Sequence, residues 1–63
     1  MKKISKKVRE GVINRFFETA NELPHSINYL NKEGNWRVFE CKSSNNCLQI
    51  GFNENTNEFI RVA

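Results

Sequence analysis

The sequence predicts an α+β fold in which one N-terminal amphipathic helix packs on one face of a four-stranded antiparallel β-meander. Three observations support this prediction. The first third of the chain repeats apolar residues every three to four positions, the rest alternates apolar and polar residues, and turn-forming residues interrupt that alternation three times. Because 63 residues suffice for only one small domain, we expect residues 1–63 to share a single core.

The helix is expected over residues 7–23, after a basic N-terminal arm at residues 1–6. Pro24 ends it, because proline lacks the N–H that a helix needs and disfavours helical geometry at the preceding residue. The apolar side chains at helical spacing should form one stripe that faces the sheet. These residues are Val8, Val12, Phe16, Ala20 and Leu23.

The meander is expected over residues 26–62, and the lengths of its turns set a strand register. That register places two rows of apolar side chains on the face that the helix covers. The predicted strands lie near residues 26–31, 35–42, 47–53 and 58–62, with turns at 31–34, 43–46 and 53–57. The predicted rows are Ile27, Phe39, Ile50 and Ile60, and next to them Cys41, Leu48 and Val62.

The same register leaves apolar side chains on the opposite face of the sheet, where no helix covers them. A contiguous apolar patch on a small protein usually marks a contact surface. Alternatively, the C-terminus or the basic arm folds back over part of it. The predicted partner-binding residues, apolar patch and polar rim together, are Leu30, Trp36, Val38, Phe59, Arg61 and Glu40.

Two glycines inside the predicted elements each allow two interpretations. Gly11 costs the helix about 1 kcal/mol relative to alanine, so it is either tolerated on the surface or marks a close approach of the helix. Gly51 either admits a bulge in the third strand or leaves bare backbone on which Trp36, Phe59 or a ligand lies.

Positive charge is concentrated at the N-terminus. Residues 1–9 carry five basic side chains and no acid, whereas residues 10–63 carry five basic side chains and seven glutamates. The formal charge of +3 is therefore the sum of a +5 arm and a −2 body. Such an arm could contact the phosphates of a nucleic acid. The candidate contacts are Lys2, Lys3, Lys6, Lys7 and Arg9.

Catalysis and metal binding are not expected. The sole histidine, His25, should lie far from the 43–47 turn, and the chain has no aspartate to orient it. Cys41 is expected in the core and Cys47 outside it, both as free thiols, which with His25 would make an unusual metal-ligand set. The sequence therefore predicts a protein that is not an enzyme and has no cofactor, metal or small-molecule substrate.

Two hypotheses about function remain. The first is recognition of a protein partner, or of a second copy in a homodimer, through the exposed sheet face. The richness in lysine, isoleucine and asparagine is typical of AT-rich genomes, and small phage or plasmid products often act as inhibitors or regulators. The second hypothesis is nucleic-acid binding through the basic arm and exposed aromatic side chains. We expect a cytoplasmic protein, because no apolar run approaches the roughly 20 residues that cross a membrane and no signal peptide is evident.

Overall fold

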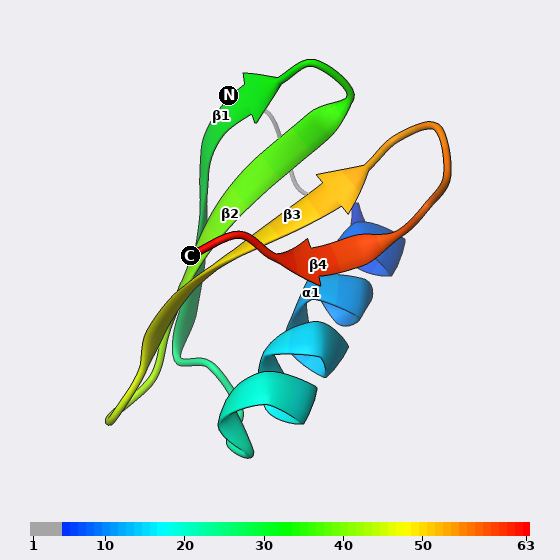
Figure 1. Ribbon diagram of the computed structural model, residues 1–63. Helices are drawn as coiled ribbons and strands as arrows, with labels where there is room; N and C mark the ends of the chain where they lie inside the picture. Colours follow the sequence, from blue (N-terminus) through cyan, green and yellow to red (C-terminus); the bar gives the residue numbers. More distant parts are fainter. Residues whose placement is uncertain (1–4) are drawn as a thin grey trace.

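The fold is one helix followed by a four-stranded antiparallel sheet (Figure 1). A computed structural model describes residues 5–63. The strand order in the sheet is β1-β2-β3-β4, so each strand pairs with its neighbour in sequence and the predicted α+β meander is confirmed. The elements are α1 (Lys6–Ala20), β1 (Ser26–Glu33), β2 (Trp36–Lys42), β3 (Cys47–Asn53) and β4 (Phe59–Arg61).

Local capping sets both ends of α1. The helix begins one residue earlier than predicted, because the side chain of Ser5 accepts a hydrogen bond from the backbone N–H of Val8 at 3.2 Å. It ends three residues earlier than predicted, at Ala20. The next residue, Asn21, adopts a left-handed conformation with φ 61° and donates its N–H to the carbonyl of Phe17 at 2.8 Å. Asparagine tolerates this conformation, so the helix stops before Pro24 can act.

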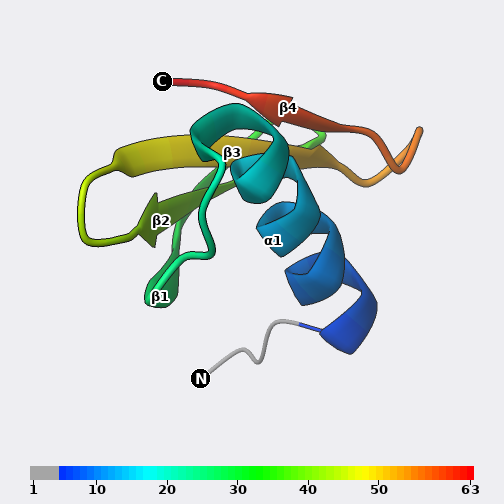
Figure 2. The same ribbon diagram turned by 90° about the horizontal axis from the view of Figure 1, so that it is seen from below.

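The helix covers one face of the sheet and packs mainly on β3 and β4 (Figure 2). Gly11 lies where this packing is closest: a Cβ on Gly11 would sit 2.1 Å from Cζ of Phe59. The interpretation of Gly11 as a close approach is therefore confirmed. The buried residues that join helix and sheet are Val12, Phe16, Phe39, Cys41, Leu48 and Ile50.

The β2–β3 hairpin has the predicted register, whereas the β1–β2 hairpin does not. Lys42 pairs with Cys47 across the four-residue loop, as expected. In the first hairpin the loop is Gly34 and its neighbour only, with φ 63° at Gly34, a positive value as in the two-residue turns that favour glycine. The predicted turn sets Asn31 opposite Asn35 and so Tyr29 opposite Arg37. Tyr29 pairs with Phe39 instead, and a bulge at residue 30 shifts the strand register between Tyr29 and Asn31.

The β3–β4 register differs from the prediction by one residue. Phe52 pairs with Phe59 instead of Glu58, so the connection between the paired residues is 53–58, one residue longer than predicted. Within it the backbone N–H of Asn53 donates to the carbonyl of Glu58 at 2.9 Å. The side-chain oxygen of Asn53 stabilises this turn, because it accepts hydrogen bonds from the backbone N–H groups of Asn55 and Thr56. A slip of one residue exchanges the faces of a strand. Ile60 therefore pairs with Gly51, on the face away from the helix, and is not the core residue that was predicted.

Candidate interaction surface

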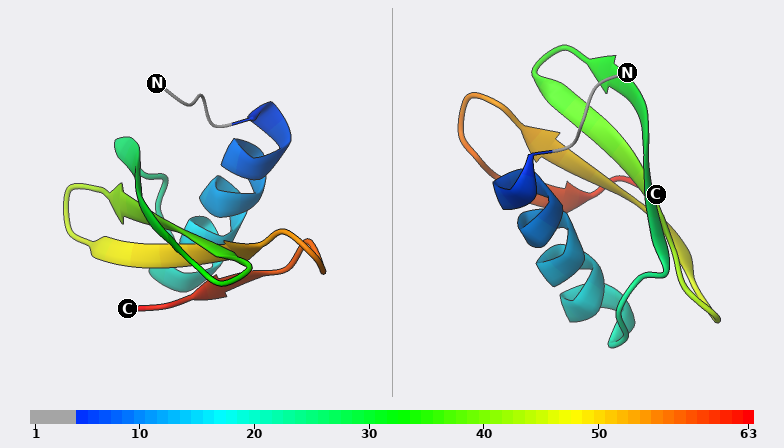
Figure 3. Two further views of the ribbon diagram at one scale, coloured as in Figure 1. Left: turned by 90° about the horizontal axis from the view of Figure 1, so that it is seen from above. Right: turned by 180° about the vertical axis from the view of Figure 1, so that it is seen from behind.

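The face of the sheet opposite α1 has no second layer within residues 5–63. Figures 2 and 3 show α1 on one side of the sheet, and none of the elements within residues 5–63 covers the other side. We call this side the outer face. Its residues follow from the strand pairing, because side chains alternate between the two faces and paired residues share a face.

Apolar side chains close over a bare glycine at the centre of the outer face. A Cβ on Gly51 would lie 2.9 Å from Cγ2 of Val62, 3.3 Å from Cε3 of Trp36 and 3.8 Å from Cγ1 of Ile60. Val38, which pairs with Gly51, is only 5% exposed although no other element covers this face. The expectation that Gly51 is backbone beneath an aromatic ring is therefore right for Trp36.

The C-terminal residues contribute to this cover. Val62 lies beyond β4, and its N–H donates to the carbonyl of Gln49 at 2.7 Å, which holds it beside β3. This agrees with the alternative interpretation that the C-terminus covers part of the patch. The cover is incomplete, because Ile60 and Val62 remain 43% and 49% exposed.

Two of the six predicted binding residues lie on the helix side instead. Phe59 packs over Gly11, and Arg61 pairs with Ile50, which is fully buried on that side. Their predicted placement is wrong because of the one-residue slip between β3 and β4. Ile60 and Val62, which had been assigned to the core, take their places on the outer face.

The other four predicted residues do lie on the outer face. Leu30 sits at the bulge, where it and Asn31 both oppose Val38, and it is exposed. Trp36 is half-buried, and Val38 is buried rather than exposed as predicted. Glu40 lies toward the other end of the face. The apolar part, which we call the outer cluster, consists of Leu30, Trp36, Val38, Ile60 and Val62.

The outer face carries few charges. Glu40 pairs with Lys42 at 3.7 Å on the same strand and receives a weak contact from the thiol of Cys47 at 4.0 Å. Glu33, which pairs with Trp36, is the remaining charged residue assigned to this face by the register. The outer face is thus an apolar cluster with a thinly charged margin, which is typical of a surface that binds proteins.

The two cysteines are free, as predicted. Cys47 is exposed at the start of β3, on the outer face. Cys41 is buried in the core, and this burial, with smaller contributions from Cys47 and Glu40, raises the pKa of its thiol to about 11. Only Cys47 is therefore available as a reactive thiol at neutral pH.

The basic residues proposed for nucleic-acid contact are only partly described. Lys2 and Lys3 lie outside the described residues, whereas Lys6, Lys7 and Arg9 are exposed on the first turns of α1. The structure does not bring these three together with the outer cluster, because α1 lies on the other side of the sheet.

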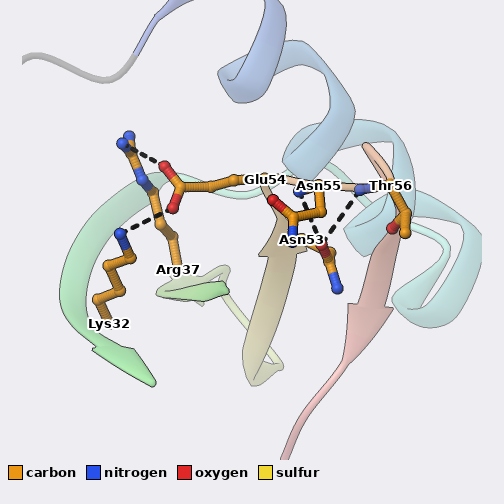
Figure 4. Close-up of polar contacts among 6 residues, drawn as sticks. All are labelled: Lys32, Arg37, Asn53, Glu54, Asn55 and Thr56. Carbon is orange, nitrogen blue, oxygen red and sulfur yellow. Dashed lines mark hydrogen bonds and ion pairs between the residues drawn. The ribbon is translucent and has the colours of Figure 1, made fainter. Parts of the chain in front are cut away.

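A second basic site, on the helix side of the sheet, is occupied by a carboxylate of the chain itself. Glu54 contacts Lys32 at 2.9 Å and Arg37 at 2.6 Å (Figure 4). The hydrogen bond from Lys32, together with the charges of Arg37 and Lys32, lowers the pKa of Glu54. One of these two positive charges is therefore compensated internally, which weakens this site for phosphate binding.

His25 lies next to the loop between β2 and β3, contrary to the prediction. The backbone N–H of His25 donates to the carbonyl of Lys42 at 2.6 Å, and Nε2 of its ring lies 3.2 Å from Oγ of Ser44. The pairing of Ser26 with Lys42 causes this placement, since it brings the residue before β1 to the end of β2.

A nearby carboxylate completes this polar cluster without forming a catalytic triad. Glu22 accepts a hydrogen bond from Nδ2 of Asn46, and the bonds from Ser43 and Asn46 lower its pKa. Within residues 5–63, no carboxylate hydrogen-bonds to the ring of His25, and Ser44 and His25 are both exposed. The cluster therefore ties the α1–β1 linker to the β2–β3 loop and lacks the oriented base that a serine nucleophile needs.

Comparisons of the chain with protein families, with curated proteins and with solved structures return no match. The part of the chain that the structure describes contains no helix long and apolar enough to cross a membrane. It also contains no group of three or more side chains able to hold a metal ion.

Proposed function

We propose that this protein is a non-enzymatic, cytoplasmic binding protein that recognises a protein partner through the outer cluster. The observation that carries the proposal is the closure of Trp36, Ile60 and Val62 over Gly51 on a face without a second layer. Sheets in small domains normally bury an apolar face against another layer. A partner would supply that layer.

The energetics favour an apolar partner surface. Ile60, Val62 and Leu30 each keep close to half of their side-chain surface in water. Completing the burial of such a side chain contributes about 1 kcal/mol. Trp36 adds a large, partly fixed ring of the kind that dominates protein interfaces. Glu33, Glu40 and Lys42 would form the polar rim.

A protein of this kind acts by occupying a surface of its partner. We infer a regulatory or inhibitory role from this mode of action, because what the outer face mainly offers a partner is apolar contact area. Recognition of nucleic acid through Lys6, Lys7 and Arg9 is the competing hypothesis. It has less support, because these residues lie away from the outer cluster and Glu54 partly compensates the second basic site.

A capture experiment with matched variants tests the proposal. Cells that express the protein are crosslinked, and captured chains of any kind, this protein included, are identified for wild type, Val62→Lys and Phe17→Lys. Phe17 is 47% exposed on the helix and Val62 is 49% exposed on the outer face, so the two changes add the same charge at similar exposure. We expect Val62→Lys to lose the crosslinked chain and Phe17→Lys to retain it. Crosslinks to nucleic acid alone that are lost in a Lys6, Lys7 and Arg9 triple alanine variant would refute the proposal in favour of its competitor.

A further inference from the structure

We propose that the partner of the outer face is a second copy of this chain, packed outer face to outer face about a twofold axis. The inference rests on the proposed function, because it uses the same surface. A twofold contact requires a surface that is complementary to itself. The charge pattern of the outer face meets this requirement, and its area approaches that of a small dimer interface.

The charge pattern allows the face to meet its own copy. A face dominated by one sign of charge would repel a second copy, since like charges brought together at an interface cost several kcal/mol. Glu40 and Lys42 carry opposite charges side by side and already pair at 3.7 Å. Across a twofold axis each can exchange its partner for the opposite charge of the other copy. Glu33 alone has no opposite charge assigned to the same face, and it lies near the tip of the first hairpin.

The size of the face suits a small, reversible dimer. The four strands hold 8, 7, 7 and 3 residues, and with a rise of about 3.4 Å per residue and a spacing of about 4.8 Å they make a face of roughly 400 Å². This estimate fits within the molecular extents of 30 × 24 × 20 Å. Two such faces bury about 800 Å² in projection, and side-chain relief raises the accessible area toward the low end of specific interfaces, about 1,200 Å².

Face-to-face packing explains more of the surface than pairing along a strand edge. Proteins protect sheet edges with bulges, lysines and short strands. The β1 edge carries the bulge at residue 30 and Lys32, and β4 has only three residues. Stacking of the two sheets would instead bury Trp36, Ile60 and Val62 at the centre of a four-layer assembly, helix, sheet, sheet, helix.

Sedimentation equilibrium over about 10 μM to 1 mM, a range suited to a weak interface, tests the inference. Wild type should shift from 7.4 kDa toward twice that mass. Val62→Lys should weaken dimerisation at least about 30-fold, because each copy contributes the changed residue, while Phe17→Lys should leave it unchanged. Circular dichroism of each variant checks that the fold is retained.

A second measurement does not depend on any substitution. Protein without ¹⁵N receives a nitroxide label at Cys47 and is mixed with ¹⁵N-labelled protein that carries no nitroxide. The label goes to Cys47 alone, because burial and a raised pKa protect the thiol of Cys41. Intermolecular broadening should reach amides of β2, β3 and β4 on the outer face and should spare α1. Broadening confined to α1 would overturn the inference.

The outcomes separate this inference from the proposed function. A wild type that stays at 7.4 kDa up to about 1 mM overturns the second copy as partner, yet leaves the proposed function standing if a Val62-dependent protein partner is captured. A dimer that Phe17→Lys breaks and Val62→Lys does not would also overturn it. If no Val62-dependent contact is found in either experiment, both proposals are refuted.

Discussion

Gly11→Ala should destabilise the protein, although it removes a poor helix former from the middle of a helix. In an exposed helix the change stabilises by about 1 kcal/mol. Here the new Cβ would sit 2.1, 2.4 and 2.7 Å from Cζ, Cε1 and Cε2 of Phe59. Carbon atoms in favourable contact are about 3.5 to 4.0 Å apart, so the ring must retreat by roughly 1.5 Å.

The retreat of the ring sets the magnitude. Phe59 packs on Phe52 with ring centroids 4.8 Å apart, and this pair lies against the core beneath α1. Forcing extra volume into a packed site typically costs about 1 to 3 kcal/mol. Subtracting the gain in helix propensity, about 1 kcal/mol, leaves a net loss of up to about 2 kcal/mol. For a domain of this size each kcal/mol lowers the melting temperature by about 4–8 °C.

Thermal and urea unfolding, followed by circular dichroism, measure the effect. Asn14→Ala, at an exposed position of the same helix, is the matched control and should stabilise slightly through propensity alone. The decisive variant is Gly11→Ala combined with Phe59→Leu, whose shorter side chain leaves room for the methyl group. In the Phe59→Leu background Gly11→Ala should become neutral or stabilising.

Two results would refute this reasoning. If Gly11→Ala alone stabilises by about 1 kcal/mol, the ring of Phe59 does not lie over the helix and the β3–β4 register is different. If the loss persists unchanged in the Phe59→Leu background, the two sites are not coupled and another contact causes it.

Three further predictions follow from single side chains. Cys47, which is exposed, should react with a thiol reagent in the folded protein, while Cys41, buried and with its pKa raised to about 11, should react only on unfolding; two equally fast thiols would contradict its burial. The lowered pKa values of Glu22 and Glu54 contribute stability that is fully present above their ordinary value of 4.5 and is lost as pH falls through the folded-state values. Urea midpoints should therefore decrease as the pH is lowered from 6 to 3, and should decrease by less in Glu54→Gln; an equal decrease in both proteins would contradict the contribution of the Glu54 ion pairs. Asn21→Val should cost about 1–2 kcal/mol, because a β-branched residue resists the left-handed φ of 61°, whereas Asn21→Gly should be nearly neutral; equal unfolding temperatures of these two variants would contradict the left-handed cap.

The sequence was sufficient to predict the element types and the strand order, because these depend on periodicity and on the existence of turns. The β2–β3 register was also predictable. Its four-residue loop, Ser43 to Asn46, is bounded by Lys42 and Cys47, and the apolar residues on both strands then match on the same face. Local turn chemistry and side-chain alternation agree there, so only one register fits.

The β3–β4 register could not be fixed in the same way, because β4 contains apolar residues on both faces. Phe59 and Ile60 are adjacent, so a slip of one residue simply exchanges one apolar side chain for the other. The turn is rich in asparagine, and asparagine is compatible with several turn lengths. Gly11 held the missing signal: only a residue without a side chain leaves room for the Phe59 ring beneath the helix.

The correction at β4 also bears on the choice between the two functional hypotheses. With Phe59 against the helix, the outer cluster has one aromatic ring, Trp36, beside the aliphatic side chains of Ile60 and Val62. Single-strand binders stack successive bases on several aromatic rings along a basic groove. Branched aliphatic side chains, by contrast, pack against other aliphatic side chains. Among residues 5–63, Lys42 is the one basic residue that the register assigns to this face, and Glu40 already pairs with it, so the face offers little attraction to phosphates. The register thus favours protein recognition by a surface of similar chemistry, for which a second copy of this chain is the simplest source.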